Sequence, residues 1–245
     1  MVNKTRGIVL RTVKYGETSL VVTIFTELFG LQSYMVNGVR SSSKRGSNKA
    51  AFFQPVSLLD LVAYHNELKN LQRLKEYKWN FLYRHIFSDV KKHSVALFMI
   101  ELLTRCLKQP EPHPELFYFT EDALAHLDDA EDTVTANFPL FFAVHLAVFF
   151  GFRITDNYTL SRNFLDLEEG VFVSEQPLHS NYVADSEAAS VSHILKIMQP
   201  SELKDVVLKQ EQRRRLIQVI EKYYALHIQD FGNLKTLPVL REVLG

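Results

Sequence analysis

Four cations stand close together in one polar stretch of the sequence, residues 38–49. They are Arg40, Lys44, Arg45 and Lys49. The stretch has no acidic residue, and its Ser, Gly and Asn residues favour a loop. Each cation of such a loop can neutralise one phosphate and release a condensed counterion. The pattern predicts a loop that binds a nucleic-acid backbone, although a solvated surface loop has the same composition.

Charge is unevenly distributed along the 245 residues, although the net charge is zero. Residues 1–80 hold 12 Lys or Arg against five Asp or Glu, a balance of +7. Residues 81–245 hold 16 against 23, a balance of −7. This split predicts two parts with different partners, of which the first suits a polyanion.

The sequence lacks the common catalytic and cofactor-binding motifs. It has no Gly-x-x-x-x-Gly-Lys, Gly-x-Gly-x-x-Gly, His-Glu-x-x-His or Gly-x-Ser-x-Gly series. Cys106 is the only cysteine, which excludes an intrachain disulfide and a cysteine zinc cluster. His145 lies in an apolar run and is more typical of a hydrogen-bonded core residue than of a metal ligand. We expect no enzymatic activity, no cofactor and no metal.

The alternative to this expectation is an enzyme with a metal site, for which the sequence offers an acidic run at residues 128–132. Because no apolar shell surrounds Asp128, Asp129 and Asp132 in the sequence, a solvated run is favoured over a metal site. A nuclease built on this run would show DNA cleavage that depends on a divalent metal.

Short β-prone segments separated by glycines make up the first part of the chain. Five of the nine glycines fall within the first 46 residues, which is typical of a small β-barrel. Strands are expected at residues 8–13, 19–25, 31–36 and 56–64. By contrast, Leu68, Leu71, Leu74 and Tyr77 recur every three residues, which favours a helix on periodicity alone.

From Trp79 onward the apolar residues follow a helical period, which continues to about residue 107 before three prolines interrupt it. Further helices are expected at 120–126, with Thr120 as its cap, and at 138–150, 187–198, 211–227 and 237–244. The run 138–150 is apolar nearly all round, which predicts a buried central helix too short to cross a bilayer. The first residues lack the apolar core of a signal peptide, so we expect a soluble cytoplasmic protein.

Two spaced series of residues resemble a known family. The first comprises Thr5-x-Gly7-x-Val9-Leu10, Tyr15-Gly16-Glu17-x-Ser19, Thr26-x-x-x-Gly30, Gly38-x-Arg40 and Gln54-Pro55. The second comprises Tyr223-Tyr224-x-Leu226-His227 and Leu234-Lys235-Thr236-Leu237-x-Val239-Leu240. Together they resemble the bacterial recombination mediator family RecO over its full length.

The resemblance implies an α+β fold with an N-terminal OB-fold β-barrel followed by a mostly α-helical domain. The DNA-binding barrel would span residues 1–78, and the helical domain residues 79–245, with a small irregular or hairpin insert near 155–185. Residues 66–77 would form the fifth strand despite their spacing. Many relatives carry a four-cysteine zinc module at the positions of residues 155–182. This chain has no cysteine there, so the hairpin would be held by packing of Phe164, Leu165, Val171 and Phe172.

The same resemblance implies a non-catalytic role in DNA repair and recombination. Members of the family bind single- and double-stranded DNA, anneal complementary strands and interact with RecR and single-strand-binding protein. These interactions help to load recombinase onto coated strands. The alternative is an adaptor whose OB-fold holds another protein and never contacts DNA.

Residues and resemblance together select two candidate sites. The DNA-binding candidates are Arg6, Arg11, Lys14, Arg40, Lys44, Arg45 and Lys49, with Lys4 as a possible extension of the path. The aromatic candidates for base stacking are Tyr15, Phe25 and Tyr34, although each is more typical of a barrel core. The candidates for the acidic C-terminal tail of single-strand-binding protein are Arg105, Lys108, Phe149, Phe152 and Arg153. The competing location for this tail is the cluster Arg213, Arg214 and Arg215.

Overall fold

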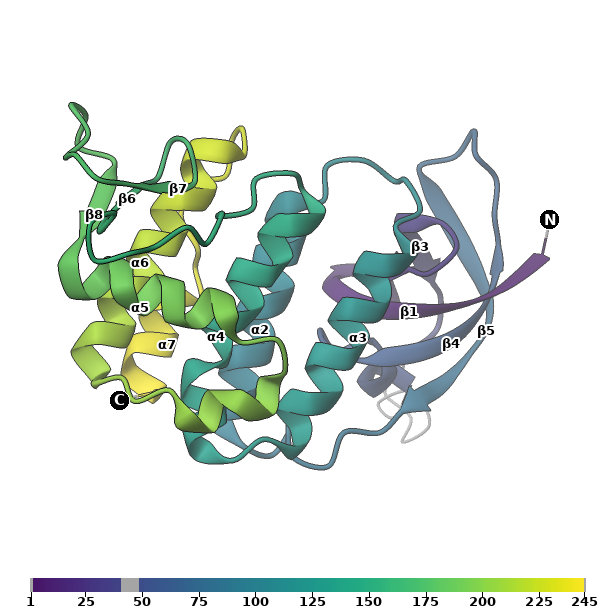
Figure 1. Ribbon diagram of the computed structural model, residues 1–245. Coiled ribbons are helices and arrows are strands. Elements are labelled where there is room, and N and C mark those ends of the chain that lie inside the picture. The colour runs from purple at the N-terminus through teal and green to yellow at the C-terminus, as the bar shows by residue number, and fades with distance from the viewer. Residues whose placement is uncertain (1, 41–48, 245) are drawn as a thin grey trace. The chain divides into compact units, whose positions relative to one another are not determined.

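The structure is a computed structural model that describes residues 2–40 and 49–244. Within these ranges, five strands close into a barrel in the order β1-β2-β3-β5-β4 (Figure 1). They are β1 (Val2–Tyr15), β2 (Ser19–Thr26), β3 (Gly30–Val36), β4 (Leu58–Tyr64) and β5 (Leu71–Phe81). All neighbours are antiparallel except β3 and β5, which pair in parallel. The predicted OB-type barrel is confirmed.

Strand β5 explains why the periodicity of this segment suggested a helix. Ala63 pairs with Leu74 and Val62 pairs with Glu76, so Lys75 is an extra residue in a β-bulge. The bulge changes the spacing of the inward side chains from two residues to three between Leu74 and Tyr77, whereas Leu68 and Leu71 of the same series are exposed. The strand continues to Phe81 and therefore crosses the domain boundary that we expected after residue 78.

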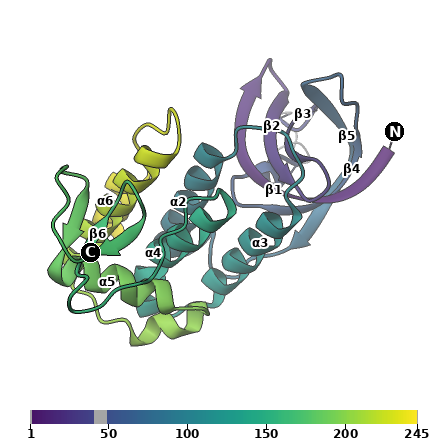
Figure 2. The same ribbon diagram turned by 45° about the horizontal axis from the view of Figure 1, so that its top comes forward.

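A helix that follows much later in the sequence belongs to the same compact unit as the barrel. Contacts divide the chain into a barrel unit, residues 1–84 and 107–125, and a helical unit, residues 85–106 and 126–245. Helix α3 (Pro114–Asp129) lies beside the barrel in both views, and the Phe117 ring is 5.7 Å from that of Phe25 (Figures 1 and 2). Thr120 lies inside α3, where its hydroxyl donates to Leu116 O at 2.8 Å, so its expected role as a cap is wrong.

The helical unit is built around α4, whose side chains are buried on nearly all sides. The helices of this unit are α2 (Val90–Cys106), α4 (Asp132–Phe149), α5 (Asp185–Lys196), α6 (Gln210–His227) and α7 (Leu237–Val243). Two short 3-10 helices are η1 (Ala51–Phe53) in the barrel unit and η2 (Pro200–Asp205) in the helical unit. Helix α4 is longer than the predicted segment, and its 18 residues are long and apolar enough to span a membrane. Since 67% of this segment is buried within the described structure, it has the character of a core helix.

The predicted hairpin between α4 and α5 is present and gains a third strand. The sheet has the order β7-β6-β8, formed by β6 (Phe164–Asp166), β7 (Val171–Val173) and β8 (Tyr182–Ala184). Leu165 and Phe172 are buried, as the packing hypothesis requires. Gly170 closes the turn with a φ of 66°, a conformation that glycine adopts without steric cost.

Candidate nucleic-acid interface

The turn between β1 and β2 gathers several of the predicted DNA-binding residues. Arg11 and Lys14 are exposed on the last part of β1. The Arg40 guanidinium donates to Gly16 O at 3.2 Å, and its backbone N–H donates to Thr18 O at 3.0 Å. These bonds hold Arg40 against the turn, so its charge lies at the same end of the barrel as Lys14.

The basic loop is only partly described. Lys44 and Arg45 lie outside the described residues, whereas Lys49 is described and exposed. No ion pair is formed by Arg11, Lys14, Arg40 or Lys49 with any described carboxylate. These four cations are therefore available to an anionic ligand within the part of the chain that the structure covers.

Arg6 has a different environment from the other candidates. Its Nη1 lies 2.7 Å from Glu121 Oε1, and its Nε donates to Glu27 Oε2 at 3.0 Å. The hydrogen bond to Glu27 raises the pKa of Arg6, and the same bond lowers the pKa of Glu27. Burial raises the pKa of Glu121 despite its contact with the Arg6 charge. Two carboxylates thus neutralise the charge of Arg6 in the protein without DNA.

Only one of the three aromatic candidates is open to a base. Tyr15 is 58% exposed at the end of β1, whereas Phe25 and Tyr34 are completely buried in the barrel unit. Burial also raises the pKa of the Tyr34 phenol. Stacking of bases on Phe25 or Tyr34 is therefore excluded in this conformation, and both act as core residues.

The sequence analysis did not propose Lys69 and Arg73 as DNA-binding residues, although both are exposed. Lys69 lies in the β4–β5 connection and Arg73 near the start of β5, and this connection is one of the two loops with which OB-folds commonly bind oligonucleotides. The sequence feature that could have indicated these two residues is the basic composition of residues 69–78. It was obscured because the three-residue spacing of the same segment favoured a helix.

The five residues proposed for the acidic tail do not share one environment. The Phe152 ring is buried, and it stacks on His227 with ring centroids 5.2 Å apart. Arg105 donates to Asn233 O at 3.2 Å and lies 3.7 Å from Glu101. Arg153 is exposed and Phe149 is half-buried, while Lys108 belongs to the barrel unit rather than the helical unit. Phe152 therefore packs inside the fold and cannot form the exposed wall of a cleft.

The competing arginine cluster borders an apolar pocket in the helical unit. Its apolar wall comes from α4, α6 and α7, through Ala136, Pro139, Leu140, Ile217, Leu240 and Leu244. Arg213, Arg214 and Arg241 line the same pocket, and no carboxylate lines it among the described residues. Arg213 and Arg214 belong to the first turns of α6, where the helix dipole also favours an anion.

The three consecutive arginines point in different directions. Arg213 donates to Leu208 O at 2.6 Å and Arg214 donates to Arg241 O at 2.7 Å. Burial lowers the pKa of Arg213. Arg215 lies outside the pocket and 3.6 Å from both Glu187 and Glu211. Two of the three cations are thus directed to the pocket and the third to carboxylates.

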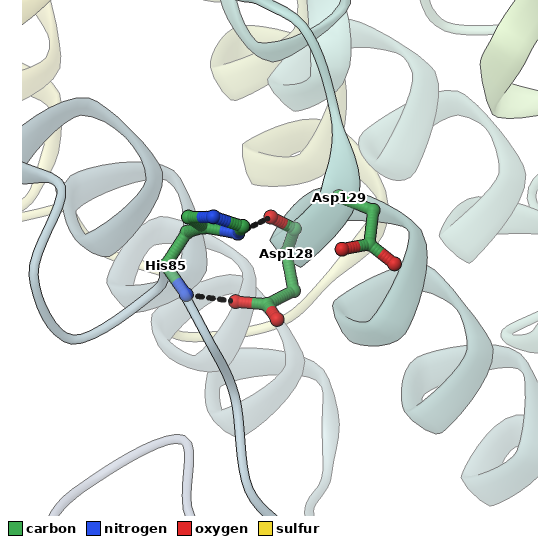
Figure 3. Close-up of side chains that lie close together, drawn as sticks. All are labelled: His85, Asp128 and Asp129. Carbon is green, nitrogen blue, oxygen red and sulfur yellow. Dashed lines mark hydrogen bonds between the residues drawn. The ribbon is translucent and has the colours of Figure 1, made fainter.

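Within the acidic run at residues 128–132, Asp128 is occupied by contacts within the fold (Figure 3). One carboxylate oxygen of Asp128 accepts the N–H groups of His85 and Ile86, each at 2.8 Å. The Asp128 carbonyl accepts from Lys92 Nζ at 2.6 Å and lies 2.9 Å from His85 Nδ1. Asp128 is 1% exposed, so the expectation of a solvated run is wrong at this residue.

His85, Asp128 and Asp129 each have a potential metal-binding atom within 4.8 Å of the others. The geometry of Asp128 is nevertheless that of a cap for the backbone that precedes α2. Asp132 forms an ion pair of 2.7 Å with Lys91, which lowers the pKa of the carboxyl. Asp128 and Asp132 thus have partners within the fold, whereas Asp129 is exposed.

Polar contacts hold the hairpin segment between α4 and α5. Asn157 donates to Phe172 O at 3.0 Å and accepts from Phe172 N at 2.8 Å. Asp166 Oδ1 accepts the N–H groups of Glu168 and Glu169 in the hairpin turn. These bonds hold the hairpin together in a segment that has no cysteine.

Comparisons with known proteins cover almost the whole chain. The family described as "Recombination protein O N terminal" matches residues 1–83, and "Recombination protein O C terminal" matches residues 88–238. The chain is 33% identical to the DNA repair protein RecO of Phocaeicola vulgatus over 246 residues, which is 100% of both chains. It is 33% identical to the protein of that name from Bacteroides fragilis (strain ATCC 25285) over 245 residues and 30% identical to that from Flavobacterium johnsoniae over 242 residues. Both matches cover 99% of each chain.

Proposed function

Because the chain belongs to the Recombination protein O family of DNA repair proteins, we propose that it anneals complementary single strands and helps to load recombinase onto coated DNA. It would act without a catalytic step, in the cytoplasm and in association with the nucleoid. The observation that carries the DNA-binding part is a group of cations on the barrel unit, of which Arg11, Lys14 and Lys49 are exposed and Arg40 is half-buried. Arg11, Lys14, Arg40 and Lys49 have no carboxylate partner among the described residues.

Annealing requires that two polyanions approach each other. Cations that neutralise the phosphates lower this repulsion, and the release of counterions supplies the driving force. The basic stretch from Arg40 to Lys49 would contact the phosphate backbone, and the exposed Tyr15 would offer a face on which bases stack. Such contacts do not depend on sequence, so strands stay free to test their pairing.

The test is annealing of complementary oligonucleotides coated with single-strand-binding protein, in the absence of ATP and metal. We expect annealing by the wild-type protein. A variant with Arg40, Lys44, Arg45 and Lys49 replaced by Ala should bind more weakly. Its slope of log affinity against log salt should flatten by about 0.7–0.9 per lost phosphate contact.

The control variant carries Lys75→Ala and Lys78→Ala, whose side chains are paired with Glu76 and Asp60. Unchanged affinity in a folded quadruple variant would remove the loop from the DNA-binding site. Binding that does not respond to salt would favour the adaptor alternative. Cleavage that requires a divalent metal would favour the nuclease alternative.

For partners, we propose RecR and the acidic tail of single-strand-binding protein. An acidic tail with an apolar end needs an apolar cleft together with cations. The pocket between α4, α6 and α7 has both properties, and this supports it over the group around Arg105 and Arg153. Arg214 is the exposed cation of its rim and would meet a carboxylate of the tail.

A labelled tail peptide titrated against two single variants tests this site. Arg214→Ala should weaken binding, whereas Arg215→Ala should not, although both variants remove one exposed cation from adjacent positions of α6. Loss of binding only in Arg105→Ala or Arg153→Ala would instead place the tail-binding site around Arg105 and Arg153. If none of the variants loses binding, the helical unit does not receive the tail at either location.

A further inference from the structure

A hollow on the barrel unit lies where the β4–β5 loop meets strand β3. It has a volume of about 510 Å³ and is lined chiefly by Met35, Tyr64, Asn66, Lys69, Leu71 and Arg73. Lys69 and Arg73 are exposed, and neither side chain has an ion pair or hydrogen bond with a described residue. Glu67 belongs to the loop but does not line the hollow. The hollow therefore has an unopposed positive charge.

The strand register places an aromatic and a cation next to each other. Arg73 pairs with Met35 on one side and with Tyr64 on the other. Directly paired residues project to the same face of a sheet, so the three side chains form one row on the outer face. The row spans two strand spacings, about 10 Å, which is enough for a base and its phosphate. Tyr64 is 48% exposed, so a face of its ring is open to a ligand.

The loop above this row is rigidly held. The buried Gln72 side chain donates to Asn66 O at 2.8 Å and to Lys69 O at 2.5 Å, and it accepts from Asn66 N at 3.0 Å. The Asn66 side chain in turn accepts from Leu68 N at 2.9 Å. Since the backbone that carries Lys69 is fixed before binding, a ligand would not have to order it.

We propose that this hollow is a subsite for one nucleotide of single-stranded DNA. Lys69 and Arg73 hold the phosphate, and the base stacks on Tyr64. The combination of cations that follow the backbone and an aromatic that takes a base is the usual mode of single-strand binding. A base within a duplex has no free face, so the subsite selects single strands. This inference rests on the proposed DNA-binding function and assigns to it a second contact region, separate from the loop at residues 38–49.

The test is binding of a labelled thymidine oligonucleotide and of a duplex with the same charge. Lys69→Ala with Arg73→Ala should weaken oligonucleotide binding about tenfold and flatten the salt slope by about 1.4, because two contacts to a single strand are lost. The matched control is Lys75→Ala with Lys78→Ala, which removes the same charge from β5 outside the hollow. Its effect should be clearly smaller. The four side chains are exposed, so thermal melting should show all variants to be folded.

Tyr64 variants separate stacking from charge. Tyr64→Ala should weaken oligonucleotide binding roughly fivefold or more and leave duplex binding unchanged, whereas Tyr64→Phe should retain the wild-type affinity. Equal losses for oligonucleotide and duplex would overturn the stacking role. An oligoglutamate that binds as tightly as the oligonucleotide, with Tyr64→Ala changing neither, would make the hollow a surface for an acidic peptide.

The outcome also separates this inference from the proposed function. If the wild-type protein binds no DNA, the proposed function itself fails. If it binds DNA through Arg40 and Lys49 but the Lys69 and Arg73 variant behaves as its control does, only the subsite is wrong.

Discussion

Arg6 and Glu121 form an ion pair in which the Arg6 Nη1 atom contacts both carboxylate oxygens, at 2.7 and 2.8 Å. The contact joins strand β1 to helix α3 within the barrel unit. Arg6 also lies over the Phe117 and Tyr118 rings, with its guanidinium carbon 5.5 and 5.2 Å from the ring centroids. The residue that the sequence suggested for DNA therefore has a structural role that accounts for its charge.

Arg6→Ala is expected to destabilise the protein by about 1–3 kcal/mol, because it leaves Glu27 and Glu121 without their partner in a partly buried position. Urea denaturation measures the change. Arg11→Ala is the control on the same strand, and its exposed side chain predicts a change within about 0.5 kcal/mol. DNA affinity should fall more in Arg11→Ala than in Arg6→Ala. Equal stability of the two variants would contradict the structural role of Arg6.

Gly30→Ala is expected to be much more harmful than Gly16→Ala. Both glycines have a positive φ, 60° and 56°, which costs a residue with a Cβ atom about 1–2 kcal/mol. At Gly30 a Cβ atom would also lie 1.9 Å from Glu111 O, whereas at Gly16 it would meet nothing within 4 Å. Thermal melting of the two variants should therefore differ, with Gly30→Ala lower. Equal melting temperatures would show that residues near Glu111 move away without cost.

Stability is expected to fall as the pH rises above 10. Burial raises the pKa of Tyr223 to about 12, and it also raises the pKa values of Tyr34 and Tyr224. In the unfolded chain these phenols lose their protons near pH 10, while the folded protein retains them. The stabilisation is thus complete below pH 10 and is lost as the pH rises toward the folded pKa values, by up to about 1.4 kcal/mol per pH unit for each phenol.

Urea denaturation at pH 9, 10 and 11 checks this dependence. Tyr34→Phe removes one of the three groups and should show a smaller loss between pH 10 and 11 than the wild-type protein. An identical loss would mean that Tyr34 does not contribute.

Removal of metal is expected to leave the protein intact. The hairpin at residues 164–173 is held by Asn157, Asp166 and a buried pair of apolar side chains, and the chain has no cysteine there. EDTA should not change the melting temperature, whereas Asn157→Ala should lower it. One zinc per chain in elemental analysis, together with a lower melting temperature in EDTA, would contradict this expectation.

The sequence allowed much of the barrel to be predicted because β2, β3 and β4 alternate over most of their length between buried and less buried residues, and glycines mark the turns. The fifth required the family resemblance, since the bulge at Lys75 breaks the alternation. Most helices were also predictable from periodicity, but the helical period expected from Trp79 is wrong at its start, because β5 runs to Phe81 and α2 begins only at Val90. The partners of the helices were not predictable, because an apolar face on α3 does not specify whether it packs on a barrel or on other helices.

The candidate sites were predictable only in part, for a related reason. Composition indicated a basic region, but it could not show that Arg6 is opposed by two carboxylates from distant positions. It also could not distinguish the buried Asp128, which caps a backbone segment 42 residues earlier, from its exposed neighbour Asp129. Pairing across long sequence separations decides which charges remain available.

Residues 107–125 belong to the barrel unit although residues 85–106 of the helical unit precede them, and this order affects folding during synthesis. A ribosome that adds about 5–20 residues per second completes β5 some seconds before Ala125 leaves it. During that interval the nascent barrel lacks Phe117, which covers Phe25 in the finished protein, and Arg6 lacks Glu121. The barrel unit is consequently complete only once residues 107–125 have been made, and most of the helical unit, residues 126–245, follows after that. A gene fragment that stops at Arg84 would encode a barrel with an uncovered apolar face.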